Sequence, residues 1–144
     1  MPPHRLRQAS EADREALWRL HRETMRAYVE ATWGWDEGDQ RRRFDEAFSP
    51  GRLSVVEVAG RPVGVLRVER QAAEVFLAAV EVAPAWQGRG LGTRLVQDVI
   101  AEAGGLPVAL QVLKVNPARA LYERLGFRVD GETATHYTMR RPGR

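Results

Sequence analysis

The sequence predicts a single α/β (α+β) domain spanning residues 1–144, in which strands and helices alternate. Three observations lead to this class. The apolar run at 75–82 passes through three glycines into apolar residues spaced four apart, which is the order strand, glycine loop, helix. The runs at 53–58 and 63–68 flank a turn that contains glycine and proline, as in a hairpin. A length of 144 residues suits one domain with one core.

The expected elements follow from local patterns along the chain. Ser10 and Asp13 resemble a capping box that opens a helix, and the inner stripe of this helix includes Leu17 and His21. The run at 75–82 is almost wholly apolar, as expected for a central strand covered on both faces. In order, the sequence predicts a strand at 5–8, a helix from residue 10, a helix at 39–48, strands at 53–58, 63–68 and 75–82, a helix after the glycines, a strand at 108–113, a helix from residue 117, and strands at 127–130 and 136–140.

The glycine-rich segment predicts a site for a phosphate or pyrophosphate. Gly88, Gly90 and Gly92 separate the apolar strand from the helical pattern that follows. A helix start presents unpaired backbone N–H groups and the positive end of the helix dipole. Glycines let an anion approach that backbone closely. The alternative is an ordinary strand-to-helix turn with no ligand.

Two common phosphate-binding patterns do not fit this segment. The P-loop pattern fails because no Gly-Lys-Ser/Thr closes the loop. The dinucleotide pattern fails because Thr93 stands where its third glycine would be, and no acidic residue follows about twenty positions further on. The pattern that remains is Gln87 followed by Gly90 and Gly92.

Gln-x-x-Gly-x-Gly at 87–92 resembles the hallmark of the GNAT superfamily of acyl-CoA-dependent N-acetyltransferases. A second segment, Asn116 to Phe127, is similar to the other signature of that family, in which Asn-Pro and a short helix lead into Leu-Tyr-Glu-x-x-Gly-Phe. Asn116 suits a helix N-cap, Pro117 the first helical position and Gly126 the helix end. The resemblance implies the GNAT fold, with a mixed, mostly antiparallel central sheet flanked by helices.

The resemblance also implies acetyl-CoA as cosubstrate, no metal, and direct attack of an amine on the thioester. The absence of cysteine agrees, since no acyl-cysteine intermediate can form. Tyr122 occupies the position that commonly serves as general acid to the leaving CoA thiolate, with helix packing as its structural alternative. By the same resemblance, the cofactor contacts are the backbone of Gln87, Gly88, Arg89, Gly90, Leu91, Gly92 and Thr93, the strand-end backbone of Val80 and Val82, and the side chains of Asn116 and Tyr122.

The sequence lacks the two glutamates that serve as general base in members of the family that it resembles. Gln111 and Phe76 stand where members of the family carry them. Glu81 is the remaining candidate catalytic residue, because burial in an apolar strand makes a carboxylate a better base. Its alternative role is to pin a strand bulge or a neighbouring backbone N–H. His136 and His21 are weaker candidates, expected at a strand edge and at the edge of the core, and a water chain is a further route for the proton.

Aromatic side chains beside carboxylates after the first helix indicate a site for a cationic amine. The candidate acceptor-binding residues are Tyr28, Trp33, Trp35 and Asp36. The structural alternative is that the two tryptophans pack the corner between two helices and that Asp36 caps the second one. The expected acceptor is a small molecule with a primary amine or a peptide N-terminus. The alternative function is a non-catalytic acyl-CoA-binding sensor or regulatory module.

Composition argues against several other classes. The net charge of +3 rests almost wholly on arginine, with Lys114 the only lysine, and the tight basic run at 41–43 is flanked by acidic residues. We therefore expect no nucleic-acid partner. No apolar run approaches the roughly 20 residues of a membrane span, so we expect no membrane partner and a cytoplasmic location. The resemblance is also compatible with a homodimer.

Overall fold

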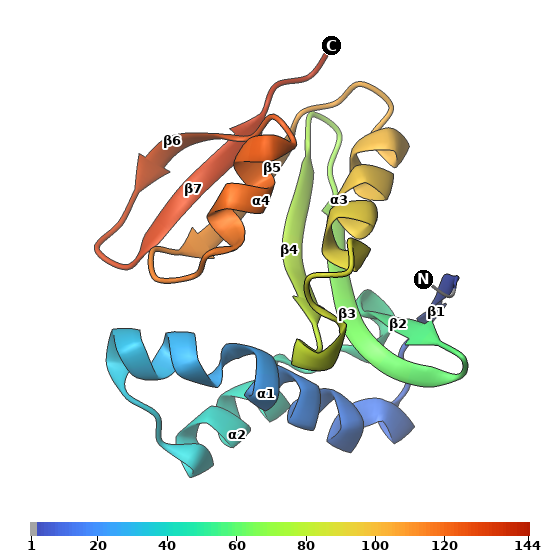
Figure 1. The fold of residues 1–144 in the computed structure, drawn as a ribbon, viewed down its shortest axis with the longest axis vertical. Coiled ribbons are helices and arrows are strands. Elements are labelled where there is room, and N and C mark those ends of the chain that lie inside the picture. Colours follow the sequence, from blue (N-terminus) through green and yellow to red (C-terminus); the bar gives the residue numbers. More distant parts are fainter. Residues whose placement is uncertain (1–2) are drawn as a thin grey trace. The chain divides into compact units, whose positions relative to one another are not determined.

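Residues 3–144, which the computed structural model describes, form seven strands and four α-helices in the order that the sequence predicts (Figure 1). The elements are β1 (His4–Gln8), α1 (Arg14–Trp33), α2 (Glu37–Ala47), β2 (Ser54–Val58), β3 (Arg61–Arg70), β4 (Val75–Val82), α3 (Leu91–Glu102), β5 (Val108–Leu113), α4 (Ala118–Arg124), β6 (Arg128–Glu132) and β7 (His136–Arg141). Short 3₁₀ turns at Glu11–Asp13, Pro50–Arg52 and Pro84–Trp86 lie before α1, before β2 and after β4.

The strands belong to one seven-stranded sheet, in the order β1-β2-β3-β4-β5-β7-β6. Strands β1 and β2, β2 and β3, β5 and β7, and β6 and β7 pair antiparallel, whereas β4 and β5 pair parallel. The predicted fold class, a mixed and mostly antiparallel sheet flanked by helices, is therefore confirmed.

Two compact units make up the chain, and each is drawn from two segments. The first unit runs up to Arg67 and includes Ala79–Arg89, and the second unit consists of Val68–Ala78 and Gly90–Arg144. The single-domain organisation that the length predicts stays a prediction.

The core of the first unit lies where α1 packs on β2 and β3. Its buried members are Ala9, Leu17, Leu20, Val55 and Val65, and partly buried Phe44, Phe48, Leu53 and Ala83 pack against them. No residue of α2 is fully buried, so this helix contributes a half-buried aromatic face rather than a core stripe.

A buried carboxylate fixes the start of α1. The Ser10 N–H donates to Asp13 Oδ2 at 2.8 Å, which confirms the predicted capping box. The guanidinium of Arg7 forks onto the same carboxylate at 2.9 and 2.7 Å, and its Nε donates to Glu57 at 2.8 Å. Hydrogen bonds from Arg7, against the opposing effect of burial, lower the pKa of Asp13 from 3.8 to about 2.

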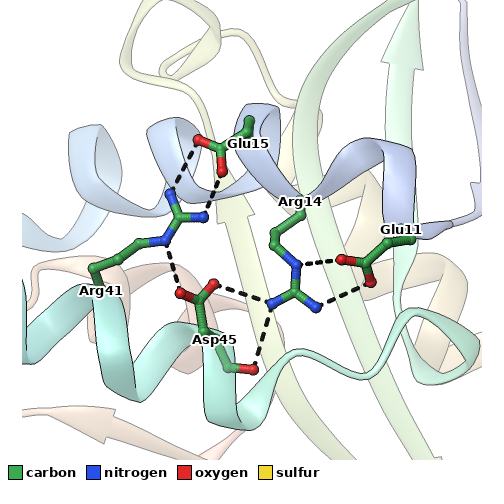
Figure 2. A network of polar contacts seen from close by, with 5 residues as sticks. All are labelled: Glu11, Arg14, Glu15, Arg41 and Asp45. Carbon is green, nitrogen blue, oxygen red and sulfur yellow. Dashed lines mark hydrogen bonds and ion pairs between the residues drawn. The ribbon is translucent and has the colours of Figure 1, made fainter.

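A network of arginines and carboxylates joins α2 to the first turns of α1 (Figure 2). Asp45 of α2 accepts from Arg41 Nε and from a terminal nitrogen of Arg14, both at 3.0 Å. Arg41 also forks onto Glu15, and Arg14 forks onto Glu11. Single exposed ion pairs contribute only about 0–1 kcal/mol, but paired forks of this kind fix the relative geometry of the two helices.

In the second unit, α3 buries one stripe and β5 and β7 form a ladder beside it in the core. Helix α3 buries Leu91, Leu95, Val96 and Val99, which confirms the predicted four-residue spacing. Phe127, Val108 and Met139 are at most 1% exposed and form the centre of this core. Lys114 forms an ion pair with Glu132 at 2.6 Å. Among the described residues, no helix is long and apolar enough to cross a membrane.

The prediction that β4 is covered on both faces is wrong at one position. Val75, Leu77 and Val82 are buried, but Ala78 is exposed. Ala78 follows directly after Leu77, the last residue of β4 that pairs with β5.

Candidate functional site

The glycine loop presents backbone N–H groups at the start of α3. Gly88 and Gly90 have φ values of 74° and 84°, in the left-handed region that favours glycine. The first intrahelical bond runs from the Arg94 N–H to the Gly90 carbonyl at 3.0 Å. The N–H groups of the three residues between them therefore have no partner within the helix. A β-carbon at Gly88 or Gly90 would meet nothing within 4 Å, so the loop backbone is open on that side.

Gln87 connects this loop to the end of β4 and to the turn after it through two hydrogen bonds. Its side-chain Nε2 donates to the Val82 carbonyl at 2.9 Å, and its backbone N–H donates to the Pro84 carbonyl at 3.2 Å. Both groups are therefore already engaged, whereas the resemblance implies that the Gln87 N–H binds pyrophosphate. The exposed guanidinium of Arg89 lies 4.7 Å from the ring centroid of Trp86.

Strand β4 extends beyond its ladder with β5. The parallel pairing joins Val75–Leu77 to Val108–Leu110, and β4 continues to Val82. Val80 is half-buried and Val82 is buried. An extended ligand can pair with strand backbone of this kind in the way an added strand does.

Asn116 caps the short helix that carries Tyr122. Its side-chain Oδ1 accepts from the Ala118 N–H at 2.9 Å, and its own N–H donates to the Leu113 carbonyl at 2.9 Å. The capping prediction is confirmed, although the regular helix begins at Ala118 rather than at Pro117. The cofactor contact that the resemblance implies for Asn116 stays a prediction.

Tyr122 is a buried phenol. It is 7% exposed, and its ring meets Phe127 edge-on at a centroid distance of 5.9 Å. Burial raises the pKa of Tyr122 to about 12. The hydroxyl therefore stays protonated throughout the physiological pH range and can only donate to a developing anion.

Glu81 of β4 and His21 of α1 form a pair within the first unit. Glu81 Oε2 lies 2.9 Å from His21 Nδ1, and the side chains are 12% and 28% exposed, respectively. Glu81 Oε1 is enclosed by protein and has no hydrogen-bond partner. Burial lowers the pKa of His21, but the hydrogen bond and the charge of Glu81 raise it further, so the net shift is upward from 6.5.

Sequence reasoning found both members of this pair without joining them. The sequence predicts His21 as a group at the edge of the core, and Glu81 either as a base or as a residue that pins a strand bulge or a neighbouring backbone N–H. The available signal was that each is an ionisable residue on an otherwise apolar stripe, and buried charges are nearly always paired.

A bulge and a glycine set the backbone at Glu81. The pairing of β2 with β3 shifts register between Val56 and Glu57, so that Val63 is the extra residue. The Val63 carbonyl then accepts from the Ala83 N–H at 2.8 Å. The neighbouring Gly64 leaves room for the Glu81 carbonyl, because a β-carbon there would lie 2.6 Å from it.

The expected acceptor residues divide between an aromatic cluster and exposed positions. Trp35 stacks on Trp18 at 6.2 Å, and Trp18 and Phe44 lie 6.2 and 5.9 Å from the His21 ring. Trp35 therefore shares a cluster with His21, whereas Trp33 is 60% exposed and Tyr28 is half-buried on α1.

Asp36 caps α2, which is the structural role that the sequence offered as an alternative to acceptor binding. Its Oδ1 accepts from the Asp39 N–H at 2.8 Å and caps α2. The nearby Glu37 accepts from Trp35 Nε1 at 2.9 Å and from Arg22 at 2.8 Å. Acceptor binding by Tyr28, Trp33, Trp35 and Asp36 stays a prediction. Over residues 3–144, no group of three or more His, Cys, Asp or Glu side chains is arranged to hold a metal ion.

Comparison with solved structures identifies the fold. The chain superimposes on the PaiA N-acetyltransferase of Thermoplasma acidophilum, solved in complex with coenzyme A, with a TM-score of 0.78 at 17% identity over 97% of this chain and 99% of that one. The ribosomal-protein-S18-alanine N-acetyltransferase of Escherichia coli gives a TM-score of 0.71 at 20% identity over 97% of this chain and 94% of that one. At these identities the likeness concerns the fold alone.

Sequence comparison identifies the family. The chain is 33% identical over 124 residues to the 5-NmdU N-acetyltransferase of Pseudomonas phage PaMx11, covering 83% of this chain and 89% of that protein. It is 42% identical over 73 residues to the N-alpha-acetyltransferase RimI of Mycobacterium tuberculosis, covering 43% of this chain and 45% of that protein. The model of the acetyltransferase (GNAT) family matches residues 14–127. The resemblance drawn from the two motifs is thereby confirmed, and the chain belongs to the GNAT family of acetyltransferases.

Proposed function

We propose that this acetyltransferase binds acetyl-CoA and transfers its acetyl group to a primary amine by direct attack in a ternary complex. The observation that carries the proposal is the glycine loop, where two left-handed glycines lead into a helix whose first amides have no intrahelical acceptor. An anionic pyrophosphate is the ligand that such a helix start favours.

The cofactor contacts follow from this loop. The amides of Gly88, Arg89, Gly90, Leu91, Gly92 and Thr93 hold the pyrophosphate, and Gln87 supports them through its bond to the Val82 carbonyl. The β4 backbone at Val80 and Val82 pairs with the amide groups of the pantetheine arm. The Val82 carbonyl already accepts from Gln87, so a pantetheine contact there shares this acceptor.

The chemistry then needs one proton acceptor and one proton donor. The amine nitrogen attacks the thioester carbon, the carbon–sulfur bond breaks, and CoA leaves as a thiolate. Tyr122 donates a hydrogen bond to this thiolate, because burial keeps its phenol protonated. Glu81, directly or through another group, promotes loss of the amine proton. The sequence holds no cysteine, so no acyl-cysteine intermediate competes with direct attack.

The acceptor is the least constrained part of the proposal. The relatives are named for a 5-NmdU acceptor and for protein α-amino groups. Both names fit a primary amine, which is the class we propose for this chain. The aromatic cluster around Trp35, with Tyr28, Trp33 and Asp36 nearby in sequence, is the surface we propose for recognition of the cationic acceptor.

The test is thiol release from acetyl-CoA in a panel that contains 5-NmdU, a peptide with an N-terminal alanine, and spermidine. We expect amine-dependent release of CoA and an acetylated product by mass spectrometry. Calorimetry with CoA measures binding separately. Tight CoA binding without turnover on any amine would favour the acyl-CoA-binding sensor instead, and absence of CoA binding would remove both functions.

A further inference from the structure

The pair formed by His21 and Glu81 has a role that neither family signature assigns. We propose that His21, through Nε2, is the group that removes the proton from the acceptor amine, and that Glu81 is a positioning residue that holds the imidazole. This inference rests on the proposed amine acetylation and names the atom that performs its first proton transfer.

Accessibility separates the two side chains. Oε1 of Glu81 is enclosed by protein, and Oε2 is occupied by His21 Nδ1 at 2.9 Å. Neither carboxylate oxygen of Glu81 is therefore both accessible and without a partner. Nε2 of His21 makes no hydrogen bond with any described residue, and it is not one of the enclosed polar atoms that lack a partner, so it is open to solvent on a side chain that is 28% exposed. Nε2 is the basic atom of this pair that a substrate can reach.

The hydrogen bond also selects the tautomer. A carboxylate can only accept, so His21 Nδ1 carries the hydrogen that lies toward Glu81. The lone pair of the neutral ring is then on Nε2, as a general base requires. Because Glu81 is negative, it stabilises the imidazolium that forms when Nε2 takes a proton.

The surroundings of the ring leave Glu81 as the charge that acts on it. Helix α1 places Trp18 beside the ring and α2 places Phe44 there, at centroid distances of 6.2 and 5.9 Å. Arg41 of α2 stacks over Trp18 and is engaged by Glu15 and Asp45. Strand β4 supplies Glu81, whose backbone is held by the bulge at Val63 and by Gly64. The base is thus held by rigid elements.

The proton balance of the step is complete. An ammonium gives one proton to Nε2, which forms an imidazolium paired with the Glu81 carboxylate, and the free amine then attacks the thioester. The nitrogen loses its second proton after attack, and this proton neutralises the CoA thiolate. The imidazolium returns its proton to solvent. The products are the acetamide, CoA thiol and one released proton.

His21→Asn tests the assignment. The Asn amide nitrogen occupies the place of Nδ1 and can keep the hydrogen bond to Glu81, but the variant has no Nε2. We expect turnover with spermidine near pH 7 to fall roughly 10²–10⁴-fold, with unchanged CoA affinity and melting temperature. The defect should shrink as pH approaches the pKa of the amine, or with hydroxylamine, which is already neutral at pH 7. The control His4→Asn, on β1, should leave the rate unchanged.

Glu81→Gln supplies a readout that does not depend on activity. The carboxylate raises the pKa of His21 against the effect of burial, so its removal should lower that pKa below 6.5, measured by NMR titration of the imidazole. The acid limb of the pH–rate profile should move to lower pH by the same amount, and the rate ratio to wild type should change with pH. A purely structural Glu81 would lower thermal stability and leave this ratio constant.

The outcomes separate the two proposals. If wild type turns over no amine, the proposed function fails, and the NMR titration still decides the positioning role of Glu81. If wild type is active and folded His21→Asn keeps full turnover across pH, the inference about His21 is overturned. Should His21→Asn unfold, His21→Gln replaces it with the same expectations. An unchanged His21 pKa in Glu81→Gln overturns the positioning role.

Discussion

The backbone carbonyl oxygen of Glu81 lies 2.6 Å from the point where a β-carbon on Gly64 would be. Real β-carbons almost never come this close to a backbone oxygen, so β3 needs glycine at this position. The side chain of Val56 would also meet that carbon, at 3.4 Å. Gly64 therefore sets how closely β3 approaches the residue that orients His21.

Gly64→Ala should destabilise the protein and displace Glu81. Overpacking a tight interior site costs roughly 1–3 kcal/mol in the free energy of unfolding. We expect a loss in this range by urea titration, with a fall in turnover that exceeds any change in CoA affinity. Gly38→Ala is the matched control, because its β-carbon would make only ordinary contact, at 3.6 Å. Equal stability of the two variants would contradict the spacing role of Gly64.

Gly92→Val should weaken acetyl-CoA binding without unfolding the protein. Gly92 lies inside α3, whose backbone valine can also adopt, but a branched side chain would cover the free amides of the first turn. We expect affinity to fall roughly tenfold or more by calorimetry. Gly38→Val places the same substitution at the second residue of α2 and should leave affinity unchanged. Full affinity in folded Gly92→Val would remove the loop from the cofactor site.

Tyr122→Phe should keep CoA binding and lower turnover by roughly 10²-fold or more. The ring contact with Phe127 is retained, and only the hydroxyl that we propose as donor to the leaving thiolate is lost. Single-turnover kinetics isolate the chemical step. Tyr137→Phe, at the ring contacted by Lys114, removes an equivalent hydroxyl and should have no such effect. An unchanged chemical rate in Tyr122→Phe would exclude this residue from the mechanism.

Asp13 should contribute stability that is lost in acid. Its pKa is lowered from 3.8 to about 2 by hydrogen bonds from Arg7, so the contribution to stability is complete above about pH 5 and is lost as pH falls toward 2. Asp13→Asn should therefore be less stable than wild type near pH 6, by on the order of 1 kcal/mol, and the gap should narrow toward pH 2. Asp98→Asn, on a partly exposed turn of α3, is the control. A gap that is constant with pH would disprove this linkage.

Local patterns were sufficient for the elements and the caps. Strands β4 and β5 match their predicted bounds, and the capping roles of Ser10, Asn116 and Asp36 each involve neighbours at most three residues away. Helix α2 begins two residues earlier than predicted, at Glu37, because Asp36 supplies its cap. Interactions within one turn leave their signal in adjacent residues, which a single sequence can display.

Long-range side-chain pairing left no such signal. His21 and Glu81 are 60 residues apart, and their hydrogen bond depends on how α1 lies on the sheet. The bond from the Gln87 side chain to Val82 and the close approach at Gly64 likewise depend on backbone shape rather than on spacing. The glycine loop is visible in the sequence because its residue types lie in consecutive order, whereas His21 and Glu81 are brought together only by the fold.

The ion pairs that join α1 and α2 are chemically unreactive toward acetyl-CoA, the cosubstrate that we propose for this enzyme. The ion pairs of Figure 2 use arginine, and a guanidinium stays protonated at neutral pH and is not a nucleophile toward a thioester. A lysine amine, by contrast, is the kind of group that acetyl-CoA acylates. Lys114 is the only lysine in this sequence, and it is held by Glu132 at 2.6 Å. Self-acylation therefore has one internal target, and the charges that fix α2 to α1 persist however high the acetyl-CoA concentration rises.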